Sequence, residues 1–281
     1  ARENGGAFQA AAADGFKPQP IASIATNCDV LAILLPDDQI PPVYAEAIEP
    51  YLSSSKTFIF AHGFSVHHKT VRLPEISDVV LVAPTGPGRQ LRSLYQEGNG
   101  LPALIAVEQD ESGSAMKKGL AYAMAIGCTR AGVIETTFAE ETVVDLFCEQ
   151  AVLCGGLPEL IKRSFSTLVD NGYQPELAYI SCLKEVKLIA DLLFSAGLDG
   201  MREAISTTAQ YGSVVTGPKL IDSGTADKLT KVLRHIESGS FGKDFLNERK
   251  SGSAVTLNFI KAEKHSRLVA TGRQLRDCLR F

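Results

Sequence analysis

The sequence predicts an α/β Rossmann-like domain over residues 1–130, followed by an all-helical domain over residues 131–281. In the first part, short apolar runs alternate with helical stretches, which is typical of a parallel sheet between layers of helices. In the second part, the strand signals fade and long amphipathic segments take over. Glycines directly after several of these segments mark the expected helix ends.

Four short runs in the first part are predicted as strands. They are rich in Val, Ile, Leu or Phe and do not alternate with polar residues, so both faces of the sheet should be covered. The runs are Asp29–Leu35, Thr57–Ala61, Asp78–Ala83 and Ala103–Glu108. Helices are predicted between them at Pro42–Leu52 and Arg89–Glu97.

The second part is predicted to contain long helices only. Each has apolar residues at helical spacing, and each ends at or close to a glycine. The predicted helices are Thr142–Cys154, Leu157–Asn171, Leu177–Ala196 and Ala226–Ser238.

Charge and composition exclude several classes of partner. A net charge of −4 gives no reason to expect nucleic acid or an anionic membrane. No run approaches the roughly 18 apolar residues that span a bilayer, and no signal-peptide pattern opens the chain. The six cysteines form no Cys-x-x-Cys pair and are expected to be free thiols in a reducing compartment. The expected location is cytoplasmic, or a plastid or mitochondrion in a eukaryote.

Three acids four residues apart, Glu141, Asp145 and Glu149, should stack on one face of a helix. No Lys or Arg occurs from Glu140 to Leu160, so the carboxylates repel one another unless a cation or a distant base lies among them. Mg²⁺ suits such a site because it binds carboxylate oxygens and keeps several waters. A solvated acidic stripe is the alternative interpretation, and spacing alone does not decide between the two.

Three further features have a plain and a functional interpretation. His62 ends an apolar run before Gly63 and could be a simple turn residue. The Gly86–Gly88 turn could be an ordinary loop, but ligands bind at the carboxyl ends of strands in such sheets. Glu185, flanked by Lys184 and Lys187, could be a surface ion-pair residue.

Six segments occur in an order that resembles the ketol-acid reductoisomerase family, in its short form with one helical domain. The likeness covers nearly the whole chain and is most specific around the three acids. The segments are Leu34–Asp37, Phe60–Phe64, Val82–Gly88, Arg130–Phe138, Glu140–Gly156 and Ile205–Gly212.

The resemblance implies a two-step reaction on a 2-acetohydroxy acid such as 2-acetolactate. Mg²⁺ ions promote migration of an alkyl group by acting as Lewis acids, and NADPH then reduces the new ketone. The product is a 2,3-dihydroxy acid of branched-chain amino-acid biosynthesis. The helical domain is expected to form an intertwined homodimer, because a neighbouring subunit supplies part of the second metal site.

The resemblance also implies roles for particular residues. Asp145 would bridge two Mg²⁺ ions, Glu149 would complete the first site, and Glu185 would serve the second. His62 and Glu141 would be catalytic residues, and Glu141 would orient a metal-bound water. Substrate contact falls to Ser206, and cofactor binding to Arg2, Asp37, Asp38, Gln39 and Gly88.

The sequence departs from the family pattern in three ways. The family opens with a strand, a Gly-x-Gly-x-x-Gly turn and a helix that hold the NADPH pyrophosphate, and the roughly 45 residues that carry this first βαβ portion are missing from this sequence. Whether they exist upstream of Ala1 does not follow from the sequence. The serines that accompany Arg2 are replaced by Gly5 and Ala7. Thr85 stands in place of a lysine near the metals, and Ser181 in place of a glutamate that binds the second Mg²⁺.

Two alternatives follow from these departures. The first is another NAD(P)-dependent hydroxyacid dehydrogenase, which would transfer hydride without Mg²⁺. The second is a non-catalytic dimer that keeps the family fold and binds a metal or partner but no nucleotide. Neither the preferred 2-acetohydroxy acid nor the size of the oligomer beyond a dimer follows from the sequence.

Overall fold

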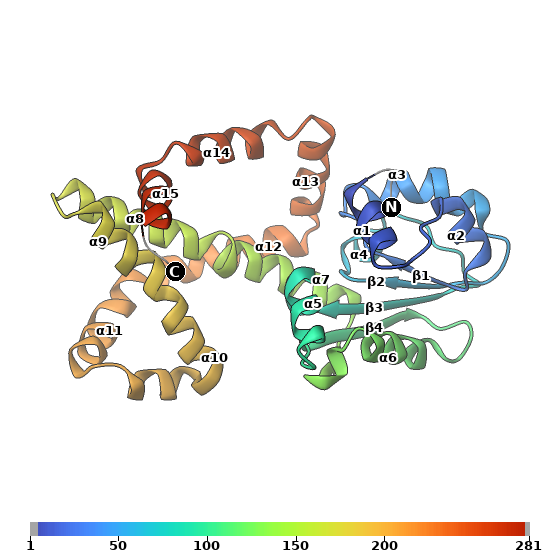
Figure 1. The fold of residues 1–281 in the computed structure, drawn as a ribbon, viewed down its shortest axis with the longest axis horizontal. Coiled ribbons are helices and arrows are strands. Elements are labelled where there is room, and N and C mark those ends of the chain that lie inside the picture. The colour runs from blue at the N-terminus through green and yellow to red at the C-terminus, as the bar shows by residue number, and fades with distance from the viewer. Residues whose placement is uncertain (1–4, 279–281) are drawn as a thin grey trace. The chain divides into compact units, whose positions relative to one another are not determined.

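The computed structural model describes residues 5–278, and the chain divides into two compact units, Ala1–Asp145 and Leu146–Phe281. Figure 1 labels the elements along the chain. The first unit holds a sheet and its helices, and the second unit is helical. The Rossmann-like and helical architectures predicted from the sequence are thus confirmed, whereas the domain boundary at residue 130 stays a prediction.

The first unit is built on a five-stranded sheet in the order β1-β2-β3-β4-β5. Its strands are β1 (Val30–Ile33), β2 (Thr57–Phe60), β3 (Asp78–Pro84), β4 (Ala103–Gln109) and β5 (Val133–Glu135). The four strands predicted from apolar runs all form, with ends shifted by one or two residues. Within residues 5–278, β1 pairs with β2 alone and is therefore an edge strand.

The expectation of a wholly parallel sheet is wrong for β4. Strands β1, β2 and β3 are parallel, but β4 runs antiparallel to β3, with Pro84 opposite Ala103. The chain leaves β3, passes through α5 (Gly88–Gln96) and returns to the same end of the sheet, so β4 must run backwards. Hydrophobicity alone does not reveal this reversal, because parallel and antiparallel buried strands carry similar residues.

The expectation that strands end before Gly132 is also wrong. β5 is a three-residue strand that pairs in parallel with β4. It follows α6 (Ala115–Ala125), which provides the crossover that a parallel connection needs. Only half-buried and exposed residues form β5, so it lacks the apolar run that identified the other strands.

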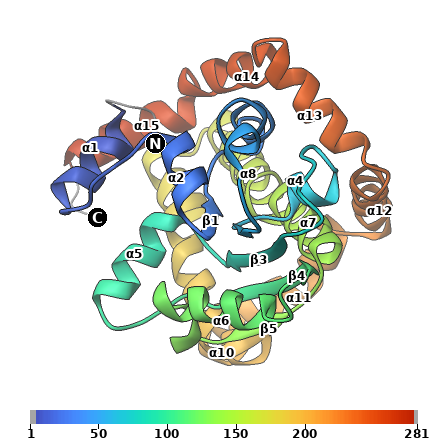
Figure 2. The same cartoon turned by 90° about the vertical axis from the view of Figure 1, so that its right-hand side faces the viewer.

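Both faces of the sheet are buried, as predicted, and the residues alternate between two cores. Phe58, Phe60 and Leu81 belong to the core under α2 (Ile21–Asn27) and α3 (Ile40–Val43). Ile59 and Val80 belong to the core under α6, which lies on the other side of the sheet in Figure 2. Residues i and i+2 of a strand share a face, so this alternation fixes the sheet between two helical layers.

The predicted helix Pro42–Leu52 is a composite of three helical types. It consists of α3, the π-helix η1 (Tyr44–Ile48) and the 3₁₀ turn η2 (Glu49–Tyr51). Regular α-helix ends at Val43, and Pro50, which has no N–H group to donate to a preceding carbonyl, lies in the final 3₁₀ turn. The remaining helical elements of the first unit are α1 (Gly6–Ala13), α4 (Phe64–His67), η3 (Cys128–Arg130) and α7 (Phe138–Cys148), whose last turn enters the second unit.

The second unit consists of helices around a small core made by Phe165, Ala178, Tyr179 and Leu275. Its elements are η4 (Glu149–Leu153), α8 (Gly156–Asp170), α9 (Pro175–Tyr179), η5 (Ile180–Lys184), α10 (Glu185–Ala204), α11 (Thr207–Leu220), α12 (Ser223–Glu237), α13 (Ser240–Lys250), α14 (Ala254–Lys264) and α15 (Arg267–Cys278). None of the helices in the described part of the chain is long and apolar enough to cross a membrane.

Two predicted long helices are interrupted by π-helical turns. The helix predicted to end at Cys154 becomes the π-helix η4 at Glu149, and η5 separates α9 from α10. Gly155 and Gly156 follow η4. Both positions require glycine, because a Cβ atom on either would lie 2.1 Å from a backbone carbonyl oxygen. These glycines therefore end the helix by close backbone approach, and π-helical turns of this kind are frequent at functional sites.

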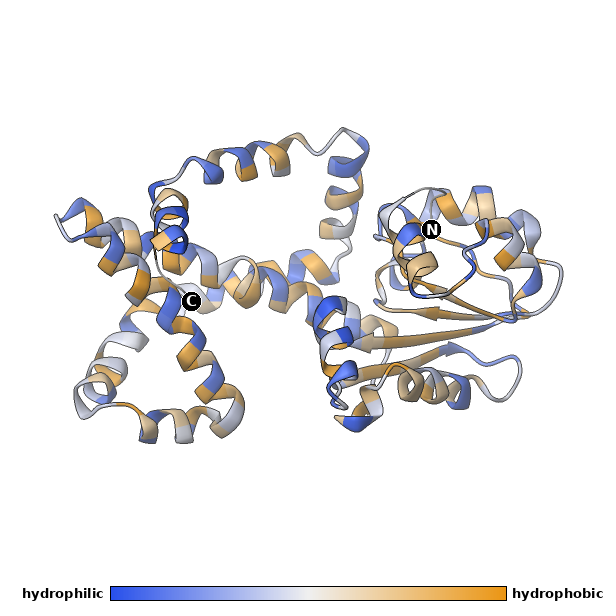
Figure 3. Ribbon diagram, viewed as in Figure 1, coloured by the Kyte–Doolittle hydropathy of each residue, from blue (hydrophilic) through white to orange (hydrophobic). Residues whose placement is uncertain are grey.

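Apolar side chains remain on the surface of the second unit. Figure 3 shows apolar residues on all of its helices, although few of them are fully buried. Phe194 in α10 is 94% exposed and Leu198 is 67% exposed. A patch of large exposed apolar side chains on a helix is typical of an interaction surface.

Candidate active site

The carboxyl ends of β1, β2 and β3 meet at one edge of the sheet, because these three strands are parallel. The chain reaches Asp37 after β1, His62 after β2 and Thr85 after β3. In open α/β sheets, ligands bind outside this edge. A functional site is therefore expected in the three segments that follow these strands.

A cluster of three ionisable side chains lies at this edge. The Nδ1 atom of His62 lies 2.9 Å from Glu141 Oε1 and 3.5 Å from Asp145 Oδ2. A ring nitrogen of His62, one carboxylate oxygen of Glu141 and one of Asp145 all lie within 4.8 Å of one another. The distant base that the acidic helix required is thus His62, which is brought in from the end of β2.

The carboxylate of Glu141 is buried and bound on both oxygens. Its Oε2 accepts the backbone N–H of Gly63 at 2.7 Å, and its Oε1 faces His62 Nδ1. Only 3% of the side chain is exposed. Because an ionised carboxylate only accepts hydrogen bonds, Nδ1 of His62 carries the proton of this pair and Nε2 remains available.

The cluster changes the protonation of its members. Burial opposes protonation of His62, but the hydrogen bond and charge of Glu141, with the charges of Asp37 and Asp145, raise its pKa to about 9. Burial raises the pKa of Asp145. The positive charge of His62 opposes this rise, and the negative charge of Glu141 adds to it. Burial also raises the pKa of Asp37, and the charge of His62 opposes the rise.

The donor set suits a hard cation at Asp145. This carboxylate is half exposed, whereas both Glu141 oxygens already accept hydrogen bonds. A carboxylate with solvent access offers the oxygen ligands that Mg²⁺ prefers, and leaves room for its waters. Glu141 and His62 would then lie beside the ion and orient its surroundings.

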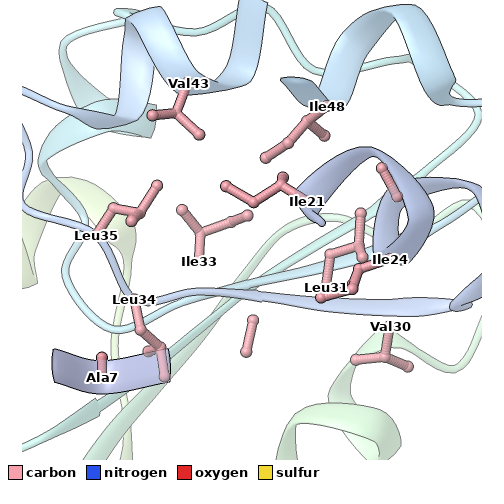
Figure 4. A pocket seen from close by; sticks show the side chains of 12 residues that line it. Ala7, Ile21, Ile24, Val30, Leu31, Ile33, Leu34, Leu35, Val43 and Ile48 are labelled. Atoms are coloured by element: carbon pink, nitrogen blue, oxygen red, sulfur yellow. The ribbon is translucent and has the colours of Figure 1, made fainter. Parts of the chain in front are cut away.

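A pocket of about 370 Å³ opens next to the cluster and is lined by Asp37, Ala61 and His62 together with apolar residues of β1 and the segment after it. A second pocket, of about 340 Å³, lies along β1. Figure 4 shows side chains such as Ile21, Ile33 and Leu34 pointing into it. All of its lining side chains are apolar, so no side chain here could carry out acid–base or metal chemistry.

The predicted cofactor residues lie around the same edge. Asp37, Asp38 and Gln39 follow β1, and Gln39 Nε2 donates to Asp38 Oδ2 at 2.9 Å. Gly88 is the first residue of α5, just after β3. Arg2 lies outside the described residues, so the structure says nothing about its predicted role.

Three predicted site residues lie in the second unit. Glu149 is the first residue of the π-helix η4. Glu185 is the first residue of α10 and accepts a hydrogen bond from Ser181 Oγ at 3.4 Å. Ser206 is the N-cap of α11 and accepts the N–H of Ala209 at 3.2 Å. The proposed ligand and substrate roles of these residues stay predictions.

Reasoning from the sequence missed the part played by Gly63 and Thr142. Gly63 donates its N–H to Glu141, and Thr142 is fully buried with its hydroxyl donating to Phe138 O at 2.7 Å. The signal was present in the His62-Gly63 pair after a buried strand. Only the fold, however, brings residues 78 positions apart into contact.

The sheet, with the ionisable cluster at its carboxyl edge, defines a Rossmann-like α/β unit joined to a helical unit. Residues 1–132 match the family described as acetohydroxy acid isomeroreductase, NADPH-binding domain. Residues 138–281 match ketol-acid reductoisomerase, C-terminal domain. The chain belongs to the ketol-acid reductoisomerase family, and these matches support a nucleotide cofactor.

Solved structures agree with this assignment. An NADH-preferring ketol-acid reductoisomerase from an uncultured archaeon is 39% identical, with a TM-score of 0.95, and the match covers 99% of this chain and 84% of that chain. A semialdehyde dehydrogenase NAD-binding protein from Cupriavidus necator, in complex with calcium and NAD, has a TM-score of 0.58 at 16% identity, over 81% of this chain and 85% of that chain. The second likeness shows the fold alone. The alternative of a metal-independent hydroxyacid dehydrogenase gains no support from these matches.

Proposed function

We propose that this protein is a working ketol-acid reductoisomerase. It converts 2-acetohydroxy acids such as 2-acetolactate to 2,3-dihydroxy acids of branched-chain amino-acid biosynthesis, by Mg²⁺-dependent alkyl migration and reduction by NADPH. The observation that carries the proposal is the cluster of His62, Glu141 and Asp145 at the ligand-binding edge of the sheet. Family membership supports this reaction, and the cluster supports it further with groups that could bind a cation and move a proton.

The proposed metal ligands are Asp145 and Glu149 for one Mg²⁺, with Glu185 serving a second ion. Asp145 has the solvent access that a hydrated ion needs. When bound, Mg²⁺ would polarise the hydroxyl and ketone oxygens of the substrate as a Lewis acid. Ser206 is proposed to contact the substrate.

His62 is proposed to move protons at the substrate. Glu141 binds Nδ1, and a pKa of about 9 leaves the imidazole protonated at neutral pH, so Nε2–H is the group that can give a proton to a substrate oxygen and then take it back. Burial of Glu141 and its bond to Gly63 keep the imidazole in one orientation. A fixed orientation places the Nε2–H proton donor before reaction begins, which lowers the entropic part of the barrier.

The proposed coenzyme is NADPH, held by Asp37, Asp38, Gln39 and Gly88 at the carboxyl edge and by Arg2. Gly5 and Ala7 stand where the family has serines, so binding of the adenosine 2′-phosphate of NADPH is expected to be weaker. One similar enzyme prefers NADH. Turnover should therefore be measured with both coenzymes, and faster turnover with NADH would contradict this part of the proposal.

The proposed assembly is a homodimer formed through the second unit. The small buried core and the many exposed apolar side chains of its helices support this assembly. Removing such apolar surface from water against a second copy would favour association. A cytoplasmic location, or an organelle in a eukaryote, stays a prediction.

A second candidate function is a non-catalytic member of the family that keeps the dimer fold. Thr85 and Ser181 favour it, because neither replaces the charge of the family residue. Thr85 donates its hydroxyl to Pro102 O at 3.0 Å, and Ser181 donates to Glu185. Two neutral hydroxyls engaged in local bonds supply neither an ammonium nor a carboxylate to the site.

The experiment that separates the two candidates is coenzyme oxidation with 2-acetolactate, with and without Mg²⁺, on the complete natural polypeptide. Mg²⁺-dependent turnover that is abolished by Asp145→Asn would establish the reductoisomerase. A folded dimer without turnover under these conditions would leave the non-catalytic family member.

A further inference from the structure

We propose that Gly63 is a positioning residue for His62. Its missing side chain and its backbone N–H together hold the Glu141 carboxylate in the orientation in which that carboxylate binds the imidazole. The kinetic consequence rests on the proposed function. The geometric consequence can be measured in the protein whether or not it turns over substrate.

Space, and not backbone conformation, requires glycine at this position. Gly63 has φ −79° and ψ −8°, a conformation open to any residue. A Cβ atom at Gly63, however, would lie 2.4 Å from Thr142 Oγ1, 2.7 Å from Glu141 Oε2 and 2.7 Å from Phe138 O. A Cβ atom makes no non-bonded contact this short, so even alanine must displace α7 or the Glu141 carboxylate.

The two oxygens of Glu141 are divided between neighbouring residues of the chain. Gly63 N–H binds Oε2 at 2.7 Å, and His62 Nδ1 binds Oε1 at 2.9 Å. The turn after β2 therefore binds the carboxylate at two points, which fixes its plane as well as its position. Moving Oε2 away from Gly63 must also turn Oε1 away from His62, because both oxygens belong to one planar group.

Thr142 closes the other side of this contact. It is fully buried, and its hydroxyl donates to Phe138 O in the preceding turn of α7. On the side that faces α7 there is consequently no space for a Cβ atom at Gly63. The most mobile of the three obstructing groups is the Glu141 carboxylate, so that group should move first.

The kinetic test is a double-mutant cycle with Gly63→Ala and Glu141→Gln. If Gly63 acts through Glu141, each variant should lower kcat about 10- to 100-fold, the usual effect of losing an outer-shell partner. The double variant should then be no slower than Glu141→Gln alone. Effects that multiply would show that Gly63 acts independently of Glu141 and would overturn the proposal.

Gly119→Ala is the matched control. Gly119 lies in α6, and a Cβ atom there would lie 2.7 Å from Val80 Cγ1 and 2.9 Å from Ile105 Cδ1. This variant crowds a buried helix–sheet contact of the same unit without touching Glu141. It should lower stability and leave kcat unchanged, which separates a general packing defect from a loss of positioning.

The structural test is the low-field proton resonance of His62 Nδ1–H bound to a carboxylate, assigned by its absence in His62→Gln. It should be present in the natural protein and in Gly119→Ala, and absent in Gly63→Ala and Glu141→Gln. If Gly63→Ala does not fold, the variant Gly63→Ala/Thr142→Ala removes the nearest obstructing atom and should still lose the resonance. Persistence of the resonance in either folded Gly63 variant would overturn the proposal, even in a protein without turnover.

Discussion

Glu141 Oε1 lies 2.9 Å from His62 Nδ1, although the two residues are 79 positions apart in the chain. This pair joins the end of β2 to the first turns of α7. It converts a column of acids, which would otherwise repel one another, into a site with a cationic partner. The pair also makes a direct prediction about protonation in the metal-free protein.

His62 should titrate near pH 9 in the metal-free protein, followed by the NMR shifts of its ring protons against pH. Burial alone would lower its pKa, but Glu141, Asp37 and Asp145 raise it to about 9. In Glu141→Gln the pKa should fall toward the usual value of about 6.5. Since the folded pKa is the higher one, the pair contributes stability below pH 6.5 and loses it as pH rises through 9. An unchanged titration in Glu141→Gln would show that Glu141 is not the partner.

Asp145→Asn should weaken Mg²⁺ binding, measured by calorimetry on the folded protein. The substitution keeps the shape of the side chain but removes the charge that a hard cation requires. We expect at least a tenfold loss of affinity, together with loss of Mg²⁺-dependent turnover. Asp244→Asn is the control, because Asp244 is an exposed carboxylate paired with His235 in the second unit. Equal loss in both variants would contradict a specific ligand role for Asp145.

The candidate site was only partly predictable from the sequence. Residues four apart on a helix share a face, so spacing alone identified Glu141 and Asp145 as neighbours. His62 was found through its place after an apolar strand and through the family resemblance. The approach of His62 to these acids depends on how β2 meets α7, and no local pattern encodes this long-range contact.

The fold was predictable where the signals are local and strong. The buried strands β2 and β3 were found within one residue at each end, because strands covered on both faces consist mostly of apolar residues. β5 was missed because it is short and poorly buried, and the π-helices η4 and η5 were missed because their apolar spacing resembles that of an α-helix. The direction of β4 depends on the path of the connecting chain.

A second ion pair should control acid stability. Asp78 is buried and accepts hydrogen bonds from Lys118 Nζ at 2.6 Å and from Ser112, and these partners outweigh burial to lower its pKa to about 2. Because the folded pKa is below its unfolded value, the pair contributes stability above about pH 4 and loses it as pH falls through 2. The contribution at neutral pH is about 2 kcal/mol. Urea unfolding of Asp78→Asn at pH 7 and pH 2, with exposed Glu46→Gln as control, should show a difference that shrinks in acid.

Gly119→Ala should destabilise the first unit despite the better helix propensity of alanine. The gain from propensity is about 1 kcal/mol, whereas forcing a methyl group against buried Val80 and Ile105 costs about 1–3 kcal/mol. Val80 and Ile105 have almost no exposed surface, so neither can move without disturbing the sheet. A lower urea midpoint would confirm the close packing, and a higher midpoint would show that α6 can shift away from β3 and β4.

Charged residues on α10 should disrupt the proposed dimer. Phe194 and Leu198 lie on either side of the kink of α10 at Gly197 and are 94% and 67% exposed, so both leave apolar surface in solvent. Burial of this surface against a second copy would favour association, and lysine at either position would have to bury an unpaired charge. Sedimentation velocity should therefore show a dimer for the natural protein and a monomer for Phe194→Lys/Leu198→Lys. The control is Lys187→Ala, which removes an exposed charge paired with Asp191 on the same helix. If the double lysine variant remains a dimer with an unchanged dissociation constant, the subunits associate through another surface.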